Sequence, residues 1–146
     1  MTTAKRSCLV NLTEQPPSSL ISEEKKSQVR ILLVEDNPFI QLIHQDMLRS
    51  LGCFVDIAAT GEEALIKLKQ EDYALILLDI GLPGINGIEV MVEFNRYKKY
   101  AKTPAIVLTA FTDQNVINQC LAIGIKEVLH KPVKTLELAR VIDFYT

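Results

Sequence analysis

The stretch LILLDIGLPGING, residues 75–87, decides the fold that this chain is expected to adopt. Its apolar run ends at Asp79, and the following residues are rich in glycine and include a proline, which favours a turn. A short apolar run of this kind is typical of a strand buried on both faces, as in a parallel sheet. The stretch therefore predicts a central strand that presents a carboxylate where the chain leaves the core.

On either side of this strand, further apolar runs alternate with helical patterns. The predicted strands are 29–34, 54–58, 74–78, 104–110 and 126–130. Five strands that alternate with five helices predict an α/β fold, with a parallel sheet covered on both faces and right-handed crossovers. At this length we expect the flavodoxin-like, doubly wound arrangement with strand order 2-1-3-4-5.

Helix signals lie between these runs. Asn37 followed by Pro38 predicts a helix start, and Gly52 predicts its end. The predicted apolar stripe of this helix is Ile40, Ile43, Met47 and Leu51. Thr60 and Glu63 predict a capping box for the next helix. Further helices are predicted from about 87 to 97, from Asp113 to Gly124, and around Leu138, Val141, Ile142 and Tyr145.

The composition limits the classes of protein to consider. A chain of 146 residues that is 48% hydrophobic suits one domain, which we place at 29–146, after a flexible tail or linker at 1–28. A net charge of −2 does not indicate direct nucleic-acid or membrane-surface binding. No secretion signal or membrane-spanning run is apparent, so a cytoplasmic location is expected. The three cysteines include no C-x-x-C pair and are expected to be reduced.

Polar residues stand at the ends of the predicted strands. Glu35 and Asp36 follow the first strand, Asp79 follows the third, Thr109 closes the fourth and Lys131 closes the fifth. The carboxyl ends of parallel strands share one edge, with a crevice where the strand order reverses, here between strands 1 and 3. We therefore expect the three carboxylates to meet there, flanked by the hydroxyl and the ammonium group.

Three adjacent carboxylates repel one another, and at least one should have a raised pKa unless a cation compensates. Mg²⁺ prefers oxygen ligands and often combines one or two carboxylates with a phosphate. In such a site Lys131 can neutralise a phosphoryl oxygen and Thr109 can donate a hydrogen bond to another. Asp79 is the best placed carboxylate to act as a nucleophile and form an acyl phosphate.

Four motifs, in order, carry a resemblance to a known family. VEDNP (34–38), LLDIGLPGINGIE (77–89), VLTA (107–110) and KPV (131–133) resemble the receiver domain of bacterial response regulators. The resemblance covers roughly residues 29–146. It extends to chemotaxis-type single-domain regulators and to the receivers of hybrid sensor kinases.

The resemblance implies a role for each matching residue. Glu35 and Asp36 correspond to the acidic pair, with Asp36 as a direct Mg²⁺ ligand, and Asp79 corresponds to the phospho-acceptor, which also ligates the metal. Gly81 would contribute a backbone carbonyl to the metal. Thr109 and Lys131 correspond to the switch hydroxyl and the active-site lysine, and the Lys131–Pro132 bond is expected to be cis.

The function implied is that of a phosphorelay module. A sensor histidine kinase or a histidine phosphotransfer protein would donate a phosphoryl group to Asp79, and the domain would catalyse its own phosphorylation and dephosphorylation. The output would be another protein, or the chain would be one piece of a longer one. Val128 stands where the family often has an aromatic residue, which keeps open a phosphorylation-independent interaction module. An aspartate-based phosphohydrolase is disfavoured because Gly81 replaces the second acid of its D-x-D motif.

Two histidines remain outside this scheme. His44 is predicted to be a partly exposed residue in the middle of its helix, and His130 to be a plain loop residue beside Lys131.

Overall fold

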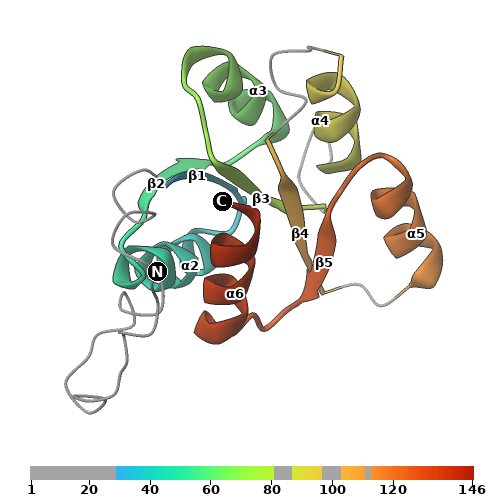
Figure 1. The fold of residues 1–146 in the computed structure, drawn as a ribbon. Helices are drawn as coiled ribbons and strands as arrows, with labels where there is room; N and C mark the ends of the chain where they lie inside the picture. The colour runs from blue at the N-terminus through green and yellow to red at the C-terminus, as the bar shows by residue number, and fades with distance from the viewer. Residues whose placement is uncertain (1–28, 81–86, 97–102, 111–112) are drawn as a thin grey trace.

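The computed structural model describes residues 29–80, 87–96, 103–110 and 113–146. The tail at 1–28 and Gly81 lie outside these ranges. Strands and helices alternate along the chain (Figure 1). The strands are β1 (Arg30–Val34), β2 (Phe54–Ala58), β3 (Leu75–Asp79), β4 (Ala105–Thr109) and β5 (Glu127–His130). The helices are α2 (Pro38–Ser50), α3 (Gly61–Gln70), α4 (Gly87–Phe94), α5 (Gln114–Ala122) and α6 (Thr135–Tyr145).

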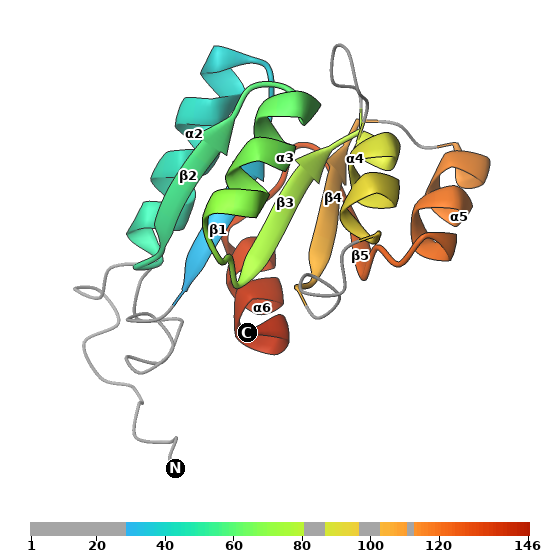
Figure 2. The same ribbon diagram turned by 90° about the horizontal axis from the view of Figure 1, so that it is seen from above.

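The strands form one parallel sheet in the described part of the chain, with the order β2-β1-β3-β4-β5. The arrowheads of β2, β3 and β4 point towards the same edge in Figure 2. The predicted α/β class and strand order are therefore confirmed. β2 matches its predicted range, and the ends of the other strands differ from the prediction by at most one residue. β3 includes Asp79 as its last residue.

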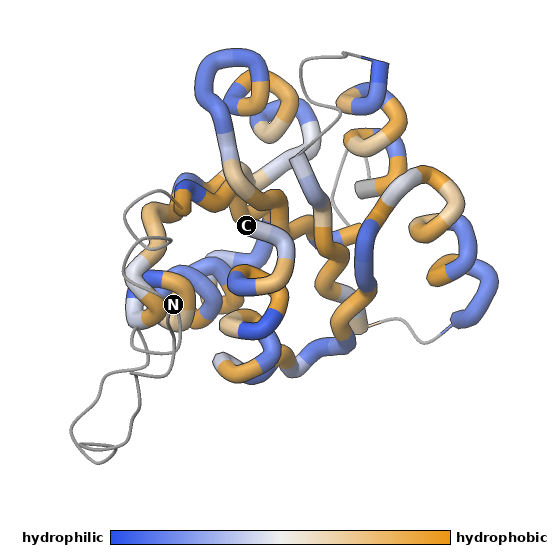
Figure 3. Tube along the Cα trace, in the orientation of Figure 1, coloured by the Kyte–Doolittle hydropathy of each residue, from blue (hydrophilic) through white to orange (hydrophobic). Residues whose placement is uncertain are grey.

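Helices cover both faces of the sheet (Figure 1). Successive residues of a strand point to opposite faces, so Leu32 and Val34 pack with α3, α4 and α5, whereas Ile31 and Leu33 pack with α2 and α6. The three inner strands β1, β3 and β4 are therefore buried along most of their length, and hydrophobic residues gather along the strands at the centre of the molecule in Figure 3. Cys53 and Cys120 are buried free thiols in these two cores, as expected for reduced cysteines.

The helix caps follow the sequence signals. The side chain of Asn37 accepts hydrogen bonds from the backbone nitrogens of Phe39 and Ile40, with Pro38 at the first helical position. The hydroxyl of Thr60 accepts a hydrogen bond from the nitrogen of Glu63. Gly52 and Gly124 follow the ends of α2 and α5 with φ values of 88° and 102°, a left-handed conformation that favours glycine.

The predicted inner face of α2 is partly wrong. Ile43 is 52% exposed, whereas His44, predicted to be partly exposed, is only 4% exposed and lies on the inner face with Leu48 and Leu51. The apolar stripe is consequently turned by about one residue from the expected one. The physical reason is helix geometry: positions 44, 48 and 51 are three or four residues apart, so they lie on the same side of the helix. Apolar residues at other positions of α2 lie on other sides and do not all face the core.

Candidate functional site

Three carboxylates lie together at the carboxyl edge of the sheet. Val34 pairs with Leu78 in the β1–β3 ladder, so the next residues, Glu35 and Asp79, come side by side. One oxygen from each of Glu35, Asp36 and Asp79 lies within 4.8 Å of the others. The predicted proximity of these three residues is thereby confirmed, because the strand order brings β1 and β3 together at the switch point.

The three carboxylates differ in their exposure. Glu35 is only 2% exposed, Asp79 is half-buried and Asp36 faces the solvent. The Glu35 side chain accepts a hydrogen bond from the backbone nitrogen of Asn37 at 3.3 Å, and the Gln41 side chain donates to the Glu35 carbonyl oxygen at 2.7 Å. These contacts hold Glu35 at the base of the cluster, so the outer two carboxylates are the accessible ones.

Lys131 joins the cluster from β5. Its Nζ lies 2.8 Å from Glu35 Oε1 and 3.5 Å from Asp79 Oδ2. The Lys131 backbone nitrogen donates to the carbonyl oxygen of Thr109 at 2.8 Å, which continues the β4–β5 ladder and fixes the base of the side chain. The Lys131–Pro132 peptide bond is cis, as expected. One ammonium group therefore bridges two of the three carboxylates.

The pKa values of Glu35 and Lys131 are shifted by burial and by the charges close to them. Burial raises the pKa of the Glu35 carboxyl group, the hydrogen bond from Lys131 counters this, and the charge of Asp79 raises the pKa further. Burial alone would lower the pKa of Lys131, but the hydrogen bond to Glu35 and the charge of Asp79 raise it overall. The lysine therefore stays charged, and an acid with a raised pKa is found in the cluster as predicted.

Thr109 ends β4 beside this cluster. It is 1% exposed, and the residue before it, Leu108, pairs with Asp79 in the β3–β4 ladder. The hydroxyl-bearing residue is thus one position beyond Asp79 on the neighbouring strand. Gly81, the predicted source of a carbonyl ligand, lies outside the described residues.

The donor set suits a hard divalent cation. All three acidic side chains offer oxygen, and two of the three carboxylates share the Lys131 ammonium group. Oxygen ligands with excess negative charge are those that Mg²⁺ prefers. The residues present therefore fit the metal that the sequence predicts.

His44 is the residue near this site that the sequence interpretation missed. Burial, followed by the charge of Lys131, lowers the pKa of its imidazole, while the charge of Asp79 opposes this change. Its Nδ1 is buried and has no hydrogen-bond partner in the part of the chain that the structure describes. A pattern of positions 44, 48 and 51 would have found it, but histidine is as common on exposed as on buried helix faces.

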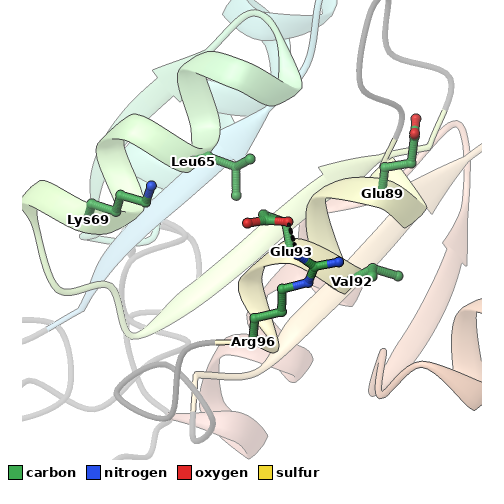
Figure 4. A pocket seen from close by; sticks show the side chains of 6 residues that line it. All are labelled: Leu65, Lys69, Glu89, Val92, Glu93 and Arg96. Atoms are coloured by element: carbon green, nitrogen blue, oxygen red, sulfur yellow. Dashed lines mark ion pairs between the residues drawn. The ribbon is translucent and has the colours of Figure 1, made fainter.

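A separate cavity of about 360 Å³ lies between α3 and α4 (Figure 4). Its lining side chains are Leu65, Lys69, Glu89, Val92, Glu93 and Arg96. Arg96 is paired with Glu93, three residues before it, at 3.5 Å. No residue of the acidic cluster lines this cavity, so it is not part of the site described above.

Comparison with known proteins agrees with the fold. Residues 31–143 match the family model described as the response regulator receiver domain. The aerobic respiration control sensor protein ArcB of Escherichia coli is 36% identical over 118 residues, which are 78% of this chain but 15% of ArcB. This chain thus corresponds to a small part of that relative. Within the described residues, none of the helices has the length and apolarity needed to cross a bilayer.

Solved structures share the fold over most of the chain. The receiver domain of a sensor histidine kinase from Pseudomonas aeruginosa, solved with magnesium coordinated in its active site cleft, is 37% identical. The match covers 80% of this chain and 96% of that one, with a TM-score of 0.75. The chemotaxis protein CheY4 of Vibrio cholerae is 26% identical, with a TM-score of 0.76 over 81% of this chain and 98% of that one. The chain belongs to the response regulator receiver domain family.

Proposed function

We propose that this chain is a phospho-accepting receiver in which Asp79 takes a phosphoryl group from a histidine kinase or a histidine phosphotransfer protein in a Mg²⁺-dependent reaction. The observation that supports this most strongly is the convergence of Glu35, Asp36 and Asp79 within 4.8 Å, with the Lys131 ammonium bridging two of them. Receiver domains of this family bind Mg²⁺ at such a cluster and act with histidine kinases or phosphotransfer proteins.

Each residue has a role that its position supports. Asp36 and Asp79 are the more exposed acids and would hold the cation, with the Gly81 carbonyl, while Glu35 lies behind them. Bound Mg²⁺ would neutralise phosphoryl oxygens and orient them for displacement. An Asp79 carboxylate oxygen then attacks the phosphorus of a phosphohistidine, the P–N bond breaks, and the imidazole leaves with its bonding electron pair and takes up a proton.

Lys131 and Thr109 would act on the phosphoryl group after transfer. The ammonium of Lys131 neutralises one phosphoryl oxygen, and the Thr109 hydroxyl donates a hydrogen bond to another. Movement of both groups towards Asp79 shifts the population of the surface formed by β4, α5 and β5, which a downstream protein reads. Attack of water on the acyl phosphate later releases phosphate and restores the carboxylate.

A protein donor also needs a surface beside Asp79. α2 starts directly after the Asp36-Asn37 step and exposes Phe39 (77%), Leu42 (61%) and Ile43 (52%). Exposed apolar residues in one patch are typical of protein interaction sites. Their continuity with the acidic cluster supports α2 as the docking surface for the phosphodonor.

The test is phosphorylation by a small-molecule donor. Purified protein is incubated with acetyl phosphate in the presence of Mg²⁺ or of a chelator, and its intact mass is measured. The proposal is supported if the protein gains the mass of one phosphoryl group in the presence of Mg²⁺ but not in the presence of the chelator. A folded protein that neither binds Mg²⁺ nor gains mass would contradict it and would favour the phosphorylation-independent interaction module instead.

A further inference from the structure

His44 is a buried imidazole for which the proposed phosphoryl transfer has no use. It is 4% exposed, and its Nδ1 has no hydrogen-bond partner among the described residues. A buried polar atom without a partner typically costs about 1–3 kcal/mol of stability. An apolar side chain of similar size would fill the same space without this loss. Packing alone therefore does not explain why this position is a histidine.

The ring lies on the inner face of α2, one turn before Leu48. α2 contacts α6 on the same side of the sheet (Figure 1). Lys131 lies in the connection from β5 to α6. Two charged groups act on the imidazole, namely the Lys131 ammonium and the Asp79 carboxylate. The imidazole therefore lies close enough to the acidic cluster to sense the charges of Lys131 and Asp79.

Lys131 has more donors than it will have acceptors once a cation is bound. An ammonium group has three N–H donors, and Lys131 donates to Glu35 Oε1 and Asp79 Oδ2. Both acceptors belong to the cluster that would bind Mg²⁺. A divalent cation held by Asp36 and Asp79 repels the ammonium group and competes for the Asp79 oxygen, so a neutral acceptor beside the ammonium group would stabilise the loaded state.

We propose that His44 is a positioning residue for Lys131, and that its buried Nδ1 accepts an ammonium N–H of Lys131 when a divalent cation occupies the carboxylate cluster. This inference rests on the proposed function, because it concerns the cation-loaded state of the same site. It accounts for the orphaned Nδ1, which has its partner only in that state. It also requires the neutral tautomer with the proton on Nε2, and burial of the ring favours the neutral form.

The inference has a thermodynamic consequence. A hydrogen bond that forms only in the loaded state stabilises that state alone, so it increases the affinity of the protein for Mg²⁺. Removing the acceptor should therefore weaken Mg²⁺ binding without exposing or unfolding the site. The expected loss is roughly three- to tenfold in Mg²⁺ affinity, the factor that corresponds to one net hydrogen bond.

The direct measurement is ¹⁵N NMR of the imidazole rings during a titration with Mg²⁺ alone, at a pH well above about 6.5. The chain has two histidines, His44 and His130, so the two rings can be assigned with a His130→Asn variant. An unprotonated nitrogen that begins to accept a hydrogen bond moves upfield. We expect this shift for His44 Nδ1 in the wild type. We expect its loss in Lys131→Met, which keeps all three carboxylates.

Two substitutions of His44 separate positioning from packing. His44→Leu fills the same space without an acceptor, and we expect it to be at least as stable as the wild type but to bind Mg²⁺ more weakly. His44→Asn keeps an oxygen acceptor near the position of Nδ1, and we expect it to retain most of the Mg²⁺ affinity. A purely structural role would change the unfolding temperature of these variants and leave their Mg²⁺ affinity unchanged.

The outcomes divide clearly. Saturation of the wild type with Mg²⁺ without the Nδ1 shift overturns this inference and leaves the proposed function intact. This inference is likewise overturned, and the proposed function left intact, if the shift persists in Lys131→Met or if His44→Leu binds Mg²⁺ as tightly as the wild type. If the wild type does not bind Mg²⁺, both proposals are overturned together. The shift, its loss in Lys131→Met, and weakened Mg²⁺ binding in His44→Leu together establish the inference.

Discussion

At the scale of single residues, the pairing of Glu35 with Lys131 is the most consequential contact of the molecule. Glu35 is almost fully buried, and its carboxylate lies 2.8 Å from the Lys131 ammonium. A buried charge that loses its partner is far more costly than a pair that is absent altogether. The stability of the cluster without metal should therefore depend on Lys131.

Replacing Lys131 with methionine tests this dependence. We expect the free energy of unfolding near neutral pH, measured by urea denaturation in a chelator, to fall by about 1–3 kcal/mol because Glu35 is left buried without a partner. Since the raised pKa of Glu35 favours its protonated form, the deficit should shrink as the pH falls. The matched control is the double variant Lys131→Met/Glu35→Gln. If the double variant is no more stable than the single one, the explanation is wrong.

His44 predicts a second pH effect of defined sign. Burial lowers the pKa of its imidazole in the folded state below the ordinary value of 6.5, so the unfolded chain binds the proton more readily. Stability is therefore lost as the pH falls below about 6.5 through the interval down to the folded pKa. In His44→Leu the slope of unfolding free energy against pH should flatten there. An equal slope in wild type and His44→Leu would refute the prediction.

At the scale of elements, the start of α2 couples helix capping to the site. Asn37 caps the helix through Phe39 and Ile40, and its backbone nitrogen donates to Glu35. The same three-residue segment, 35–37, thus supplies two acids and the cap. Loss of the cap should therefore destabilise the start of α2 and also disturb the acidic cluster.

The variant Asn37→Ala should lower the free energy of unfolding by about 1 kcal/mol, as is usual for an N-cap. It should also weaken Mg²⁺ binding, because fraying of the first turn loosens Asp36. Thr60→Ala is the matched control, since it removes the cap of α3, a helix that carries none of the three acids. Calorimetric Mg²⁺ titrations of both variants check this. If Asn37→Ala and Thr60→Ala bind Mg²⁺ equally well, the cap of α2 does not affect the Mg²⁺ site, which would contradict the expectation.

How far the sequence predicts each element depends on the signal that the element carries. β1 and β3 are apolar on both faces, so their periodicity and their place in the sheet were predictable from composition and order alone. The meeting of Glu35, Asp36 and Asp79 followed from the same topology. The inner face of α2 was not predictable, because Ile43 and His44 are adjacent and propensity does not decide which one faces the core. Tertiary packing against β1 and α6 decides it.

At the scale of the whole molecule, two surfaces flank the same edge of the sheet. The acidic cluster provides the chemistry, and the apolar patch of Phe39, Leu42 and Ile43 on α2 provides an approach for a protein. A small donor needs only the first of these, whereas a phosphorylated protein needs both. The two requirements can therefore be separated by mutation.

The double variant Phe39→Ser/Leu42→Ser should be phosphorylated by acetyl phosphate at the wild-type rate but accept phosphoryl groups more slowly from phosphorylated histidine phosphotransfer proteins. The reason is that both side chains are exposed and remote from the core, so their loss affects docking and not folding. Phe144→Ser is the control, since Phe144 is 73% exposed on α6 and lies outside the patch. Equal transfer rates for all three proteins would place the docking surface elsewhere.

The central claim is that Asp79 is the residue that accepts the phosphoryl group. The most direct test is mass-spectrometric peptide mapping after incubation with acetyl phosphate and Mg²⁺, with the acyl phosphate trapped by borohydride reduction. The account predicts that the modification lies on the peptide containing Asp79 and is abolished in Asp79→Asn. A modification that remains in folded Asp79→Asn, or that maps to Glu35 or Asp36 in the wild type, would contradict it.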